Sequence, residues 1–587
     1  MGDKGCTGAF FDHCRFLRSR CQPRHGLVRA WSDTLRQRTT LDILNAPHAP
    51  VALVTAQHDG VVASHTLLVA LGGPLPVKIA PQRADLRSDD HYQGAPGLGV
   101  PNPDDRWTDG AVRAVSHFCK SPKLGAHMAW NAADLFAQRE RERFAMHTRH
   151  LNEQMVRVLK TIGYDVGFCR GEGQYLYDRE GNRYLDLLSG FGVFAIGRNH
   201  PALREALKSV LDSQLPNLVH MDVSTLAGIL AERLLKHVPY LDKVFFLNSG
   251  SEAVEAAIKF ARAATGRPGI VYCEHAFHGL SDGALSLNGS DRFRSGFEPL
   301  LPGCVRVPFN DLVGLERALH SQTVAAFVVE PIQGKGVNLP ANDYLKSAAD
   351  LCRRHGTLFI ADEVQTGLGR TGRFLAVEHW GVEPDMVLLA KTLSGGHVPV
   401  AAVLARKKIF DKVFDRMERA VVHGSTFGAN DLAMVAGIAT LDVLTSERLI
   451  EKAAWLGERL LQGLAAMIPH YEFLHDVRGK GLMIGIEFGP PRSVKLKAAW
   501  HALEASSEGL FSQLITMPLF KEHRILSQVA SHASHTIKLL PALVISDSDC
   551  DLVINAFHTV IRGSERVPGA IWSLGKTLAG HAVRATA

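Results

Sequence analysis

The stretch DMVLLAKTLSGGHVP, Asp385–Pro399, places a lysine where an apolar run ends. The run from Met386 to Ala390 predicts a strand buried inside a sheet. Lys391 follows it directly and is followed in turn by a Ser-Gly-Gly turn. A charged amine at the edge of a core is costly unless it has a partner, whereas a lysine whose amine reaches solvent carries no such cost. The stretch therefore predicts either a lysine that serves a ligand or one that extends to solvent.

Short apolar segments like this one recur along the middle of the chain. They are KVFFL, GIVYCE, AAFVVE, TLFIADEV, DMVLLA and VAAVLA, between residues 243 and 405. Amphipathic stretches such as SEAVEAAIKFARAAT and NDYLKSAADLCRRH separate several of them. This alternation predicts an α/β fold with a mainly parallel sheet, whose ligands sit at the carboxyl ends of the strands.

The flanking regions predict further parts of the molecule. Residues 1–127 are rich in Gly, Pro, Asp, Arg and His and predict a poorly ordered extension, or an upstream segment outside the natural product, with Met128 as an alternative start. The other predicted parts are an N-terminal helix and hairpin (128–200) that join a small domain, a large domain (201–408), helices and the rest of the small domain (409–565), and a tail (566–587).

Composition excludes several classes of protein. The chain has 587 residues, of which 46% are hydrophobic and 21% charged, as in ordinary globular enzymes. Most of its net charge of +6 falls in the first 40 residues, so no nucleic-acid partner is expected. No apolar run approaches the roughly 18 residues of a membrane span. The nine cysteines include no CxxC pair, which favours a reduced, cytoplasmic protein, and Cys6, Cys14, Cys21 and His25 match no standard zinc spacing, so no metal is expected.

Two strand ends predict sites for charged groups of a ligand. Ser249, Gly250 and Ser251 open a helix after FFLN, where free N–H groups bind an anion such as phosphate. The alternative is a simple helix cap by Ser251 with Glu255 in the first turns. Asp362 follows LFIA, where a carboxylate requires a cation or a protonated ring, unless it only caps the next segment.

An aromatic pair and a lysine are the other candidate ligand-binding groups. Phe277 and His278 follow another strand, where an aromatic ring can stack on a flat ligand, although a lone Phe is more often a core residue. Lys391 in an apolar pocket becomes a nucleophilic amine because burial lowers its pKa. Together the amine, acid, aromatic ring and anion cradle match pyridoxal 5'-phosphate.

The chain resembles the class III pyridoxal-phosphate aminotransferases of the ornithine, acetylornithine and 4-aminobutyrate type, which have fold type I. The resemblance covers about residues 157–562, and its motifs occur in the family's order. They are GQYLYDREGNRYLDLLSG, NHP, NSGSEAVEAAIK, AFHG, VVEPIQG, FIADEVQTGLGRTG, AKTLSGG, HGSTFGAN and VRGKGLMIGIEF.

The resemblance implies a role for each matching residue. Lys391 would bind the cofactor aldehyde as an imine, and Asp362 would partner the ring nitrogen. Gln365 would contact the ring hydroxyl, while Phe277 with its neighbour His278 would bind the ring.

The remaining implied roles concern the phosphate, the partner subunit and the substrate. Gly250 and Ser251 would bind the phosphate. Thr426 would reach the phosphate of a neighbouring subunit, which implies a homodimer with shared active sites. Glu330 would lie near the substrate.

Two lysines depart from the family's pattern. Ornithine-type relatives carry a glutamate where Lys335 stands and a carboxylate-binding arginine where Lys538 stands. The gate around Phe191 is also more apolar than in those relatives, and the link before Lys538 is longer. These differences predict a terminal amine or aldehyde of a bulky or lipid-like substrate, with a loose similarity to enzymes that make amine-capped lipids such as hopanoid side chains. The alternatives are an ornithine δ-aminotransferase, an aminomutase on the same fold, and a non-catalytic regulator.

Overall fold

The computed structural model describes residues 56–58, 61–63, 131–506, 508–530 and 533–564. The chain divides into two compact units, 1–124 and 125–587. In the first unit, β1 (Ala56–His58) pairs antiparallel with β2 (Val61–Ala63). The predicted extension 1–127 lies almost wholly outside the described residues and stays a prediction.

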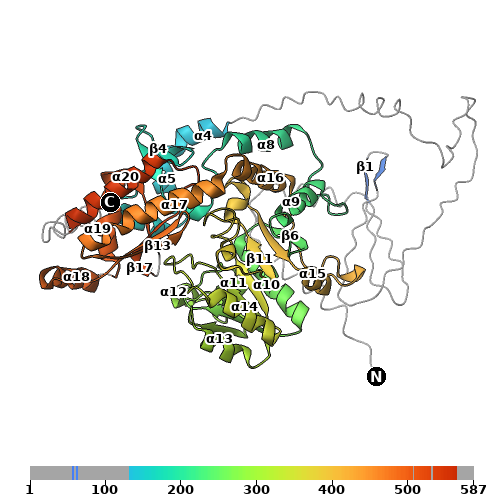
Figure 1. Ribbon diagram of the computed structural model, residues 1–587. Coiled ribbons are helices and arrows are strands. Elements are labelled where there is room, and N and C mark those ends of the chain that lie inside the picture. The colour runs from blue at the N-terminus through green and yellow to red at the C-terminus, as the bar shows by residue number, and fades with distance from the viewer. Residues whose placement is uncertain (1–55, 59–60, 64–130, 507, 531–532, 565–587) are drawn as a thin grey trace, which may run out of the picture. The chain divides into compact units, whose positions relative to one another are not determined.

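A seven-stranded sheet forms the centre of the second unit (Figure 1). In spatial order its strands are β6 (Lys243–Leu247), β12 (Ala401–Ala405), β11 (Met386–Leu389), β10 (Leu358–Asp362), β9 (Val324–Val329), β7 (Gly269–Cys273) and β8 (Cys304–Val307). Only β12 runs antiparallel to its neighbours in this sheet. All six strands expected from the sequence form, and the mainly parallel α/β architecture is confirmed.

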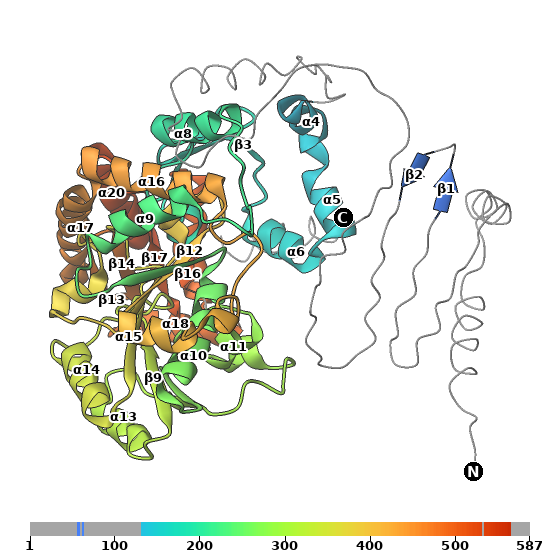
Figure 2. The ribbon, with the colours of Figure 1, turned by 90° about the vertical axis from the view of Figure 1, so that its right-hand side faces the viewer.

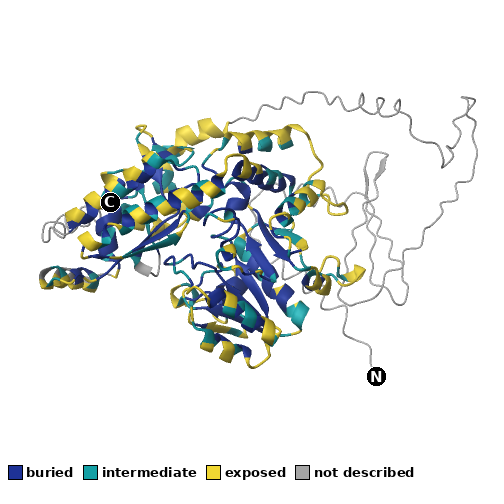
Figure 3. Cartoon of the chain, viewed as in Figure 1, coloured by how far each residue is buried: buried dark blue, intermediate teal, exposed yellow. Residues whose placement is uncertain are grey.

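Strand alternation divides the interior around this sheet into two cores. Phe359 and Ala361 of β10 face the first core, whereas Leu358 and Ile360 face the second. Strands covered on both faces need apolar residues at every position, which explains the continuous apolar runs. Figure 3 accordingly shows these strands as buried, between helices whose outer faces are exposed.

Different helices cover the two faces. The first core includes residues of α8 (Pro201–Asp212), α9 (Thr225–Leu235), α13 (Leu312–Leu319), α14 (Tyr344–His355) and α16 (Asp431–Ser446). The second includes residues of α10 (Gly250–Thr265), α11 (Asp282–Ser286) and α15 (Lys407–Val413). Short helices α7 (Ser189–Gly192) and α12 (Asp291–Arg294) lie in connecting segments.

Two smaller sheets belong to the rest of the unit. One is antiparallel, in the order β13 (Leu474–Lys480), β14 (Met483–Phe488), β17 (Ala533–Leu539) and β16 (Gln528–Ala530). The other has the order β15 (Ile525–Leu526), β5 (Arg183–Asp186), β4 (Tyr175–Asp178) and β3 (Phe168–Glu172). The expected hairpin forms from β4 and β5, and β15 adds to it in parallel, so the hairpin is tied to the C-terminal part of the chain.

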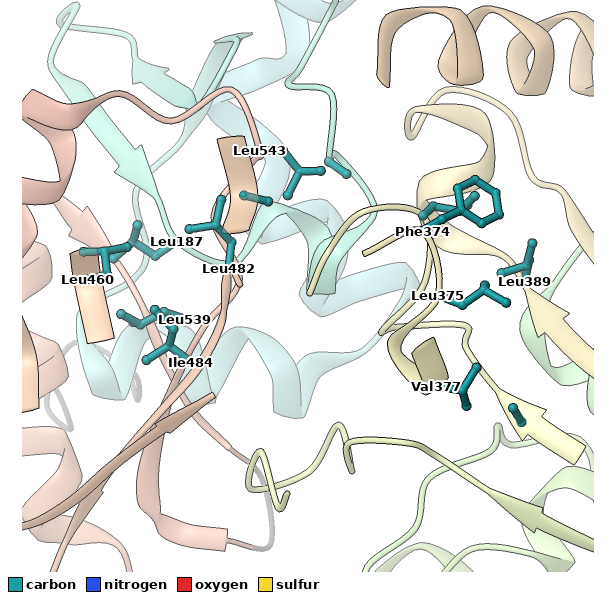
Figure 4. Packing of buried hydrophobic residues seen from close by; sticks show 14 of the residues in the cluster. Leu187, Phe374, Leu375, Val377, Leu389, Leu460, Leu482, Ile484, Leu539 and Leu543 are labelled. Atoms are coloured by element: carbon teal, nitrogen blue, oxygen red, sulfur yellow. The ribbon is translucent and has the colours of Figure 1, made fainter. Parts of the chain in front are cut away.

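Helices α17 (Leu449–Ala465), α18 (Val494–Ser506), α19 (Leu510–Lys521) and α20 (Asp547–Ser564) complete this region, and α18 and α19 lie in the long link before β17. Figure 4 shows Leu460 of α17 beside Leu187, Ile484 and Leu539. The same core continues to Phe374 and Leu389 beside the large sheet. One continuous core therefore fixes the small sheet against the large one.

Three N-terminal helices precede the hairpin: α4 (Ala132–Arg139), α5 (Arg143–His150) and α6 (Glu153–Ile162) (Figure 2). Of their residues only Val156 is buried. Among the described residues, no helix is long and apolar enough to span a membrane.

Candidate active site

A cavity of about 580 Å³ lies where four strands of the large sheet end. Gly250 follows β6, Glu330 follows β9, Asp362 ends β10 and Lys391 follows β11 closely. Lys538 reaches the same cavity from β17. All the predicted site residues except Thr426 line it: Phe191, Gly250, Ser251, Phe277, His278, Glu330, Asp362, Gln365, Lys391 and Lys538.

Lys391 begins a 3-10 turn, Lys391–Ser394, in an unusual backbone conformation. Its φ of +45° lies in the left-handed region, which costs energy for a residue with a side chain and is typical of functional sites. Thr392 holds the turn because its hydroxyl donates to the carbonyl of Gly192 at 3.0 Å. Burial lowers the pKa of Lys391, and the nearby charges of Asp362 and Glu330 oppose that shift. Lys391 therefore lines the cavity with an amine that loses its proton more readily than that of a surface lysine.

Asp362 is fixed by hydrogen bonds on both carboxylate oxygens. His278 Nδ1 lies 2.7 Å from Oδ2, and the Val364 N–H donates to Oδ1 at 3.0 Å. The second bond shows that Asp362 also caps the next turn, as the alternative reading of the sequence held. Burial lowers the pKa of His278, but its hydrogen bond to Asp362 and the charge of that carboxylate outweigh burial, so the pKa is raised. The pair presents a buried, oriented carboxylate to the cavity.

The start of α10, where the sequence predicts an anion site, lines the cavity with Ser249, Gly250 and Ser251. Ser249, not Ser251, caps the helix: its hydroxyl accepts from the Glu252 N–H at 3.2 Å, and Glu252 accepts from the Ser249 N–H at 3.1 Å. The alternative reading of a cap by Ser251 is therefore wrong, and Glu255 instead accepts from the Ser281 hydroxyl and the 283–284 backbone N–H groups. With the cap supplied by its neighbour, Ser251 is left to line the cavity.

The loop after β7 packs closely on this helix start. The Leu280 N–H donates to the Ser251 hydroxyl at 3.1 Å. A Cβ on Gly279 would lie 2.1 Å from the same oxygen, and its φ is +131°. Only glycine fits there, so Gly279 lets the Phe277–His278 segment approach the cradle.

Glu330 connects two loops of the cavity wall. One carboxylate oxygen accepts from the Phe277 N–H at 2.9 Å and the other from the Gly334 N–H at 2.8 Å. Phe277 is half-buried and meets Phe293 edge-on at 5.5 Å, so it lines the cavity instead of filling the core. Burial raises the pKa of Glu330. Glu330 therefore positions the aromatic wall.

Lys538 and Gln365 form a polar chain at the opposite wall. The Lys538 amine donates to the Gly334 carbonyl at 2.7 Å and to Gln365 Oε1 at 3.3 Å. Gln365 in turn donates to the carbonyl of Phe191 at 3.1 Å. Phe191 is 49% exposed, on a backbone with φ of +63°.

Thr426 lies away from the cavity, on an exposed loop before α16. Its predicted role concerns a second subunit and stays a prediction. The structure adds His397 to the cavity, a residue the sequence did not single out. Its Nε2 lies 3.3 Å from Asn199 Oδ1, a contact across about 200 residues that no local pattern signals.

The described residues include no group of three His, Cys, Asp or Glu side chains placed to hold a metal ion. Cys6, Cys14, Cys21 and His25 lie outside them. The donor set of the cavity instead fits pyridoxal phosphate. It offers an amine for the aldehyde, an oriented carboxylate for the ring nitrogen, an aromatic wall for the ring face and a helix start for the phosphate.

Comparisons with known proteins agree with this fit. The family model "Aminotransferase class-III" matches residues 163–561. Aminotransferase PigE of Serratia sp. is 36% identical over 443 residues, which are 70% of this chain but only 52% of that protein, so the match spans about half of its length. Acetylornithine aminotransferase of Bacillus cereus is 36% identical over 68% of this chain and 95% of its own.

The structural comparison leads to the same family. An ornithine aminotransferase from Toxoplasma gondii, solved with partial occupancy of pyridoxal phosphate at its active site, is 30% identical and has a TM-score of 0.63. The comparison covers 78% of this chain and 100% of the ornithine aminotransferase chain. This chain therefore belongs to the class III aminotransferases, the pyridoxal-phosphate enzymes of fold type I.

Proposed function

We propose that Lys391 attaches pyridoxal phosphate and moves the proton during transamination. The observation that supports this role is that Lys391 lines the same cavity as the fixed Asp362 carboxylate and the start of α10. When bound, the cofactor supplies an electron sink for the substrate carbon that loses its proton. With the cofactor bound, Lys391 Nζ would be placed to take that proton as general base and to return it.

The surrounding residues bind and orient the cofactor. Asp362, held by His278, would keep the ring nitrogen protonated because a buried carboxylate favours a positive partner. Gln365 would hold the ring hydroxyl and Phe277 the ring. Gly250 and Ser251 would hold the phosphate at the N-terminus of α10.

The substrate is a terminal amine, or the matching aldehyde, on a bulky or lipid-like chain. Apolar side chains line much of the cavity, with Phe191, Val193, Val398 and Pro399 among them. Lys335 and Lys538 occupy positions where a carboxylate and a guanidinium would suit a small amino acid better, since an ammonium lacks the bidentate fork. An ornithine aminotransferase is the second candidate, because a protein of that name shares the fold over nearly four-fifths of this chain, 78%.

Half-reactions with single amines distinguish these substrates. The yellow holoenzyme is mixed with ornithine, hexylamine or dodecylamine, and loss of the cofactor's long-wavelength absorption is followed. We expect the long-chain amines to react at least about tenfold faster than ornithine, since each buried methylene contributes about 0.8 kcal/mol. Fast conversion by ornithine without response to the long amines overturns the lipid-like substrate and supports the second candidate. Turnover of one substrate without any added carbonyl acceptor would instead indicate an aminomutase.

The protein is proposed to work as a homodimer with shared sites. Leu215, Val219, Met221 and Val223 are exposed beside the loop of Thr426, and Met221 is 97% exposed. The same segment lines a second cavity of about 470 Å³ together with Gly428, Ala429 and Asp431, and the Asp431 N–H donates to the side chain of Asn217. An exposed apolar patch of this kind typically marks a protein interface, and a second copy brings Thr426 of each subunit to the other.

Sedimentation of the full chain and of a chain starting at Met128 tests the dimer and the dispensable extension together. We expect both to sediment at twice the mass of one chain and to turn over at equal rates, because all the proposed site residues lie between 191 and 538. A monomeric full chain contradicts the homodimer. A full-length dimer whose shortened form is monomeric or inactive shows that residues 1–127 are structural.

A further inference from the structure

Three amines share the active-site cavity with few acids to balance them. Lys335, Lys391 and Lys538 all line it, and none of the three has an ion-pair partner among the described residues. The charge of Glu330 acts on all three lysines and raises the pKa of each against the effect of burial. Its carboxylate accepts hydrogen bonds from two backbone N–H groups. Asp362 is bound to His278. The cavity therefore has spare capacity for an anion.

Lys538 is the most confined of these amines. Its side chain is 5% exposed, and its Nζ has two neutral partners, the Gly334 carbonyl at 2.7 Å and Gln365 Oε1 at 3.3 Å. Either a neutral amine or an ammonium can donate both of these bonds. The contacts therefore hold the nitrogen in place without fixing its charge.

The charged groups around Lys538 come from several elements. Lys335 and Glu330 lie on the loop after β9, and Lys391 lies on the turn after β11. The residues paired with Lys538 on the neighbouring strands are uncharged, Gly485 on β14 and Gln528 on β16. Burial, followed by the charges of Lys335 and Lys391, lowers the pKa of Lys538 to about 7, and Glu330 only partly opposes this shift.

We propose that Lys538 serves two chemically different substrates by changing its protonation. As a neutral amine it lies beside an uncharged chain, and as an ammonium it binds the carboxylate of an acidic amino donor or acceptor. The inference rests on the proposed transaminase function, which requires two substrates in one site. The added proton comes from solvent: Nζ gains one N–H bond, and the resulting charge neutralises the incoming carboxylate.

The direction of the pH effect follows from this coupling. Near pH 6 most Lys538 is already protonated, so a carboxylate binds without proton uptake. Near pH 8 a smaller share is protonated, so binding takes up protons and the apparent affinity falls. An uncharged ligand of the same size shows neither effect.

Titration calorimetry of the holoenzyme with glutarate tests the proposal without turnover. Glutarate has no aldehyde, ketone or amine group and therefore does not react. Glutaramide is its uncharged control. Binding at pH 6 and at pH 8 is measured in two buffers of different ionisation enthalpy, since the difference in heat counts the protons taken up. We expect more proton uptake with glutarate at pH 8 than at pH 6, and none with glutaramide.

Three variants separate Lys538 from its neighbours. Lys538→Arg keeps a charge at all these pH values and is expected to bind glutarate without proton uptake and with little pH dependence. Lys538→Met is expected to bind it at least about tenfold more weakly at pH 6. Lys335→Met leaves the binding group intact but removes a repelling cation, so less proton uptake is expected at pH 8.

Two results would overturn the inference. One is proton uptake that persists unchanged in Lys538→Arg, which assigns the proton to another group. The other is wild-type binding that needs no proton at pH 8, or no binding of glutarate at either pH. Because glutarate does not react, these results are independent of whether the half-reactions with amines succeed.

Discussion

Replacing Lys391 by alanine is expected to abolish covalent attachment of the cofactor and to lower turnover by about 10⁴-fold or more, since one residue supplies both the anchoring amine and the general base. The wild-type protein should be yellow, and borohydride should fix the cofactor to the chain irreversibly. The intact mass of the protein after borohydride treatment then shows whether the cofactor is attached, independently of activity. The variant should fold normally, because Lys391 adopts a strained backbone that alanine tolerates no worse.

Lys335→Ala is the matched control for attachment. Lys335 lines the same cavity, but its Nζ lies over the rings of Phe277 and Phe293, at 4.7 and 5.3 Å from their centres. We expect borohydride to fix the cofactor to this variant as it does to the wild type. Attachment that survives in Lys391→Ala and is lost in Lys335→Ala would reassign the cofactor lysine.

The large sheet was predictable because its residues are buried on both faces. Each expected strand is a run of apolar residues, and the structure divides each run between two cores. The edge strand β8 was not predicted, because its sequence CVRV includes the exposed Arg306 and is therefore not a continuous apolar run. The antiparallel direction of β12 was also hidden, because strand direction depends on the path of the connecting chain and not on the strand's own residues.

The candidate site was predictable only as a set of residue types at strand ends. The sequence reading offered Ser251 as the alternative helix cap, although the glutamate three residues after a capping serine, the spacing of a capping box, follows Ser249 and not Ser251. The structure decides for Ser249, since Glu252 returns a bond to its N–H. The bond between His278 and Asp362 joins residues 84 apart, and the contacts of Lys538 with Gly334 span 204 residues. Such pairs depend on how strands are ordered in the sheet, which no local pattern encodes.

Asp362→Asn is expected to lower turnover by about 100-fold or more while the protein stays folded. An amide still accepts a hydrogen bond from His278, but it no longer favours a positive charge on the cofactor's ring nitrogen. The variant should therefore bind the cofactor and show a similar thermal midpoint. Rates of the half-reaction, followed by the loss of the cofactor absorption, measure the chemical step directly.

Glu363→Gln is the matched control for Asp362→Asn. The sequence alone does not show which of these two adjacent acids serves the site. Both acids follow the same buried strand, but Glu363 accepts from the Val377 N–H at 2.9 Å and from the Thr366 hydroxyl, and it does not line the cavity. Burial raises the pKa of Glu363 to about 7, so a neutral side chain already suits this position at neutral pH. We expect the Glu363 variant to keep its half-reaction rate within about threefold, whatever it loses in stability. An Asp362 variant that is equally active would show that the ring nitrogen needs no charged partner here, and a Glu363 variant that is equally slow would assign the loss to the strand end as a whole.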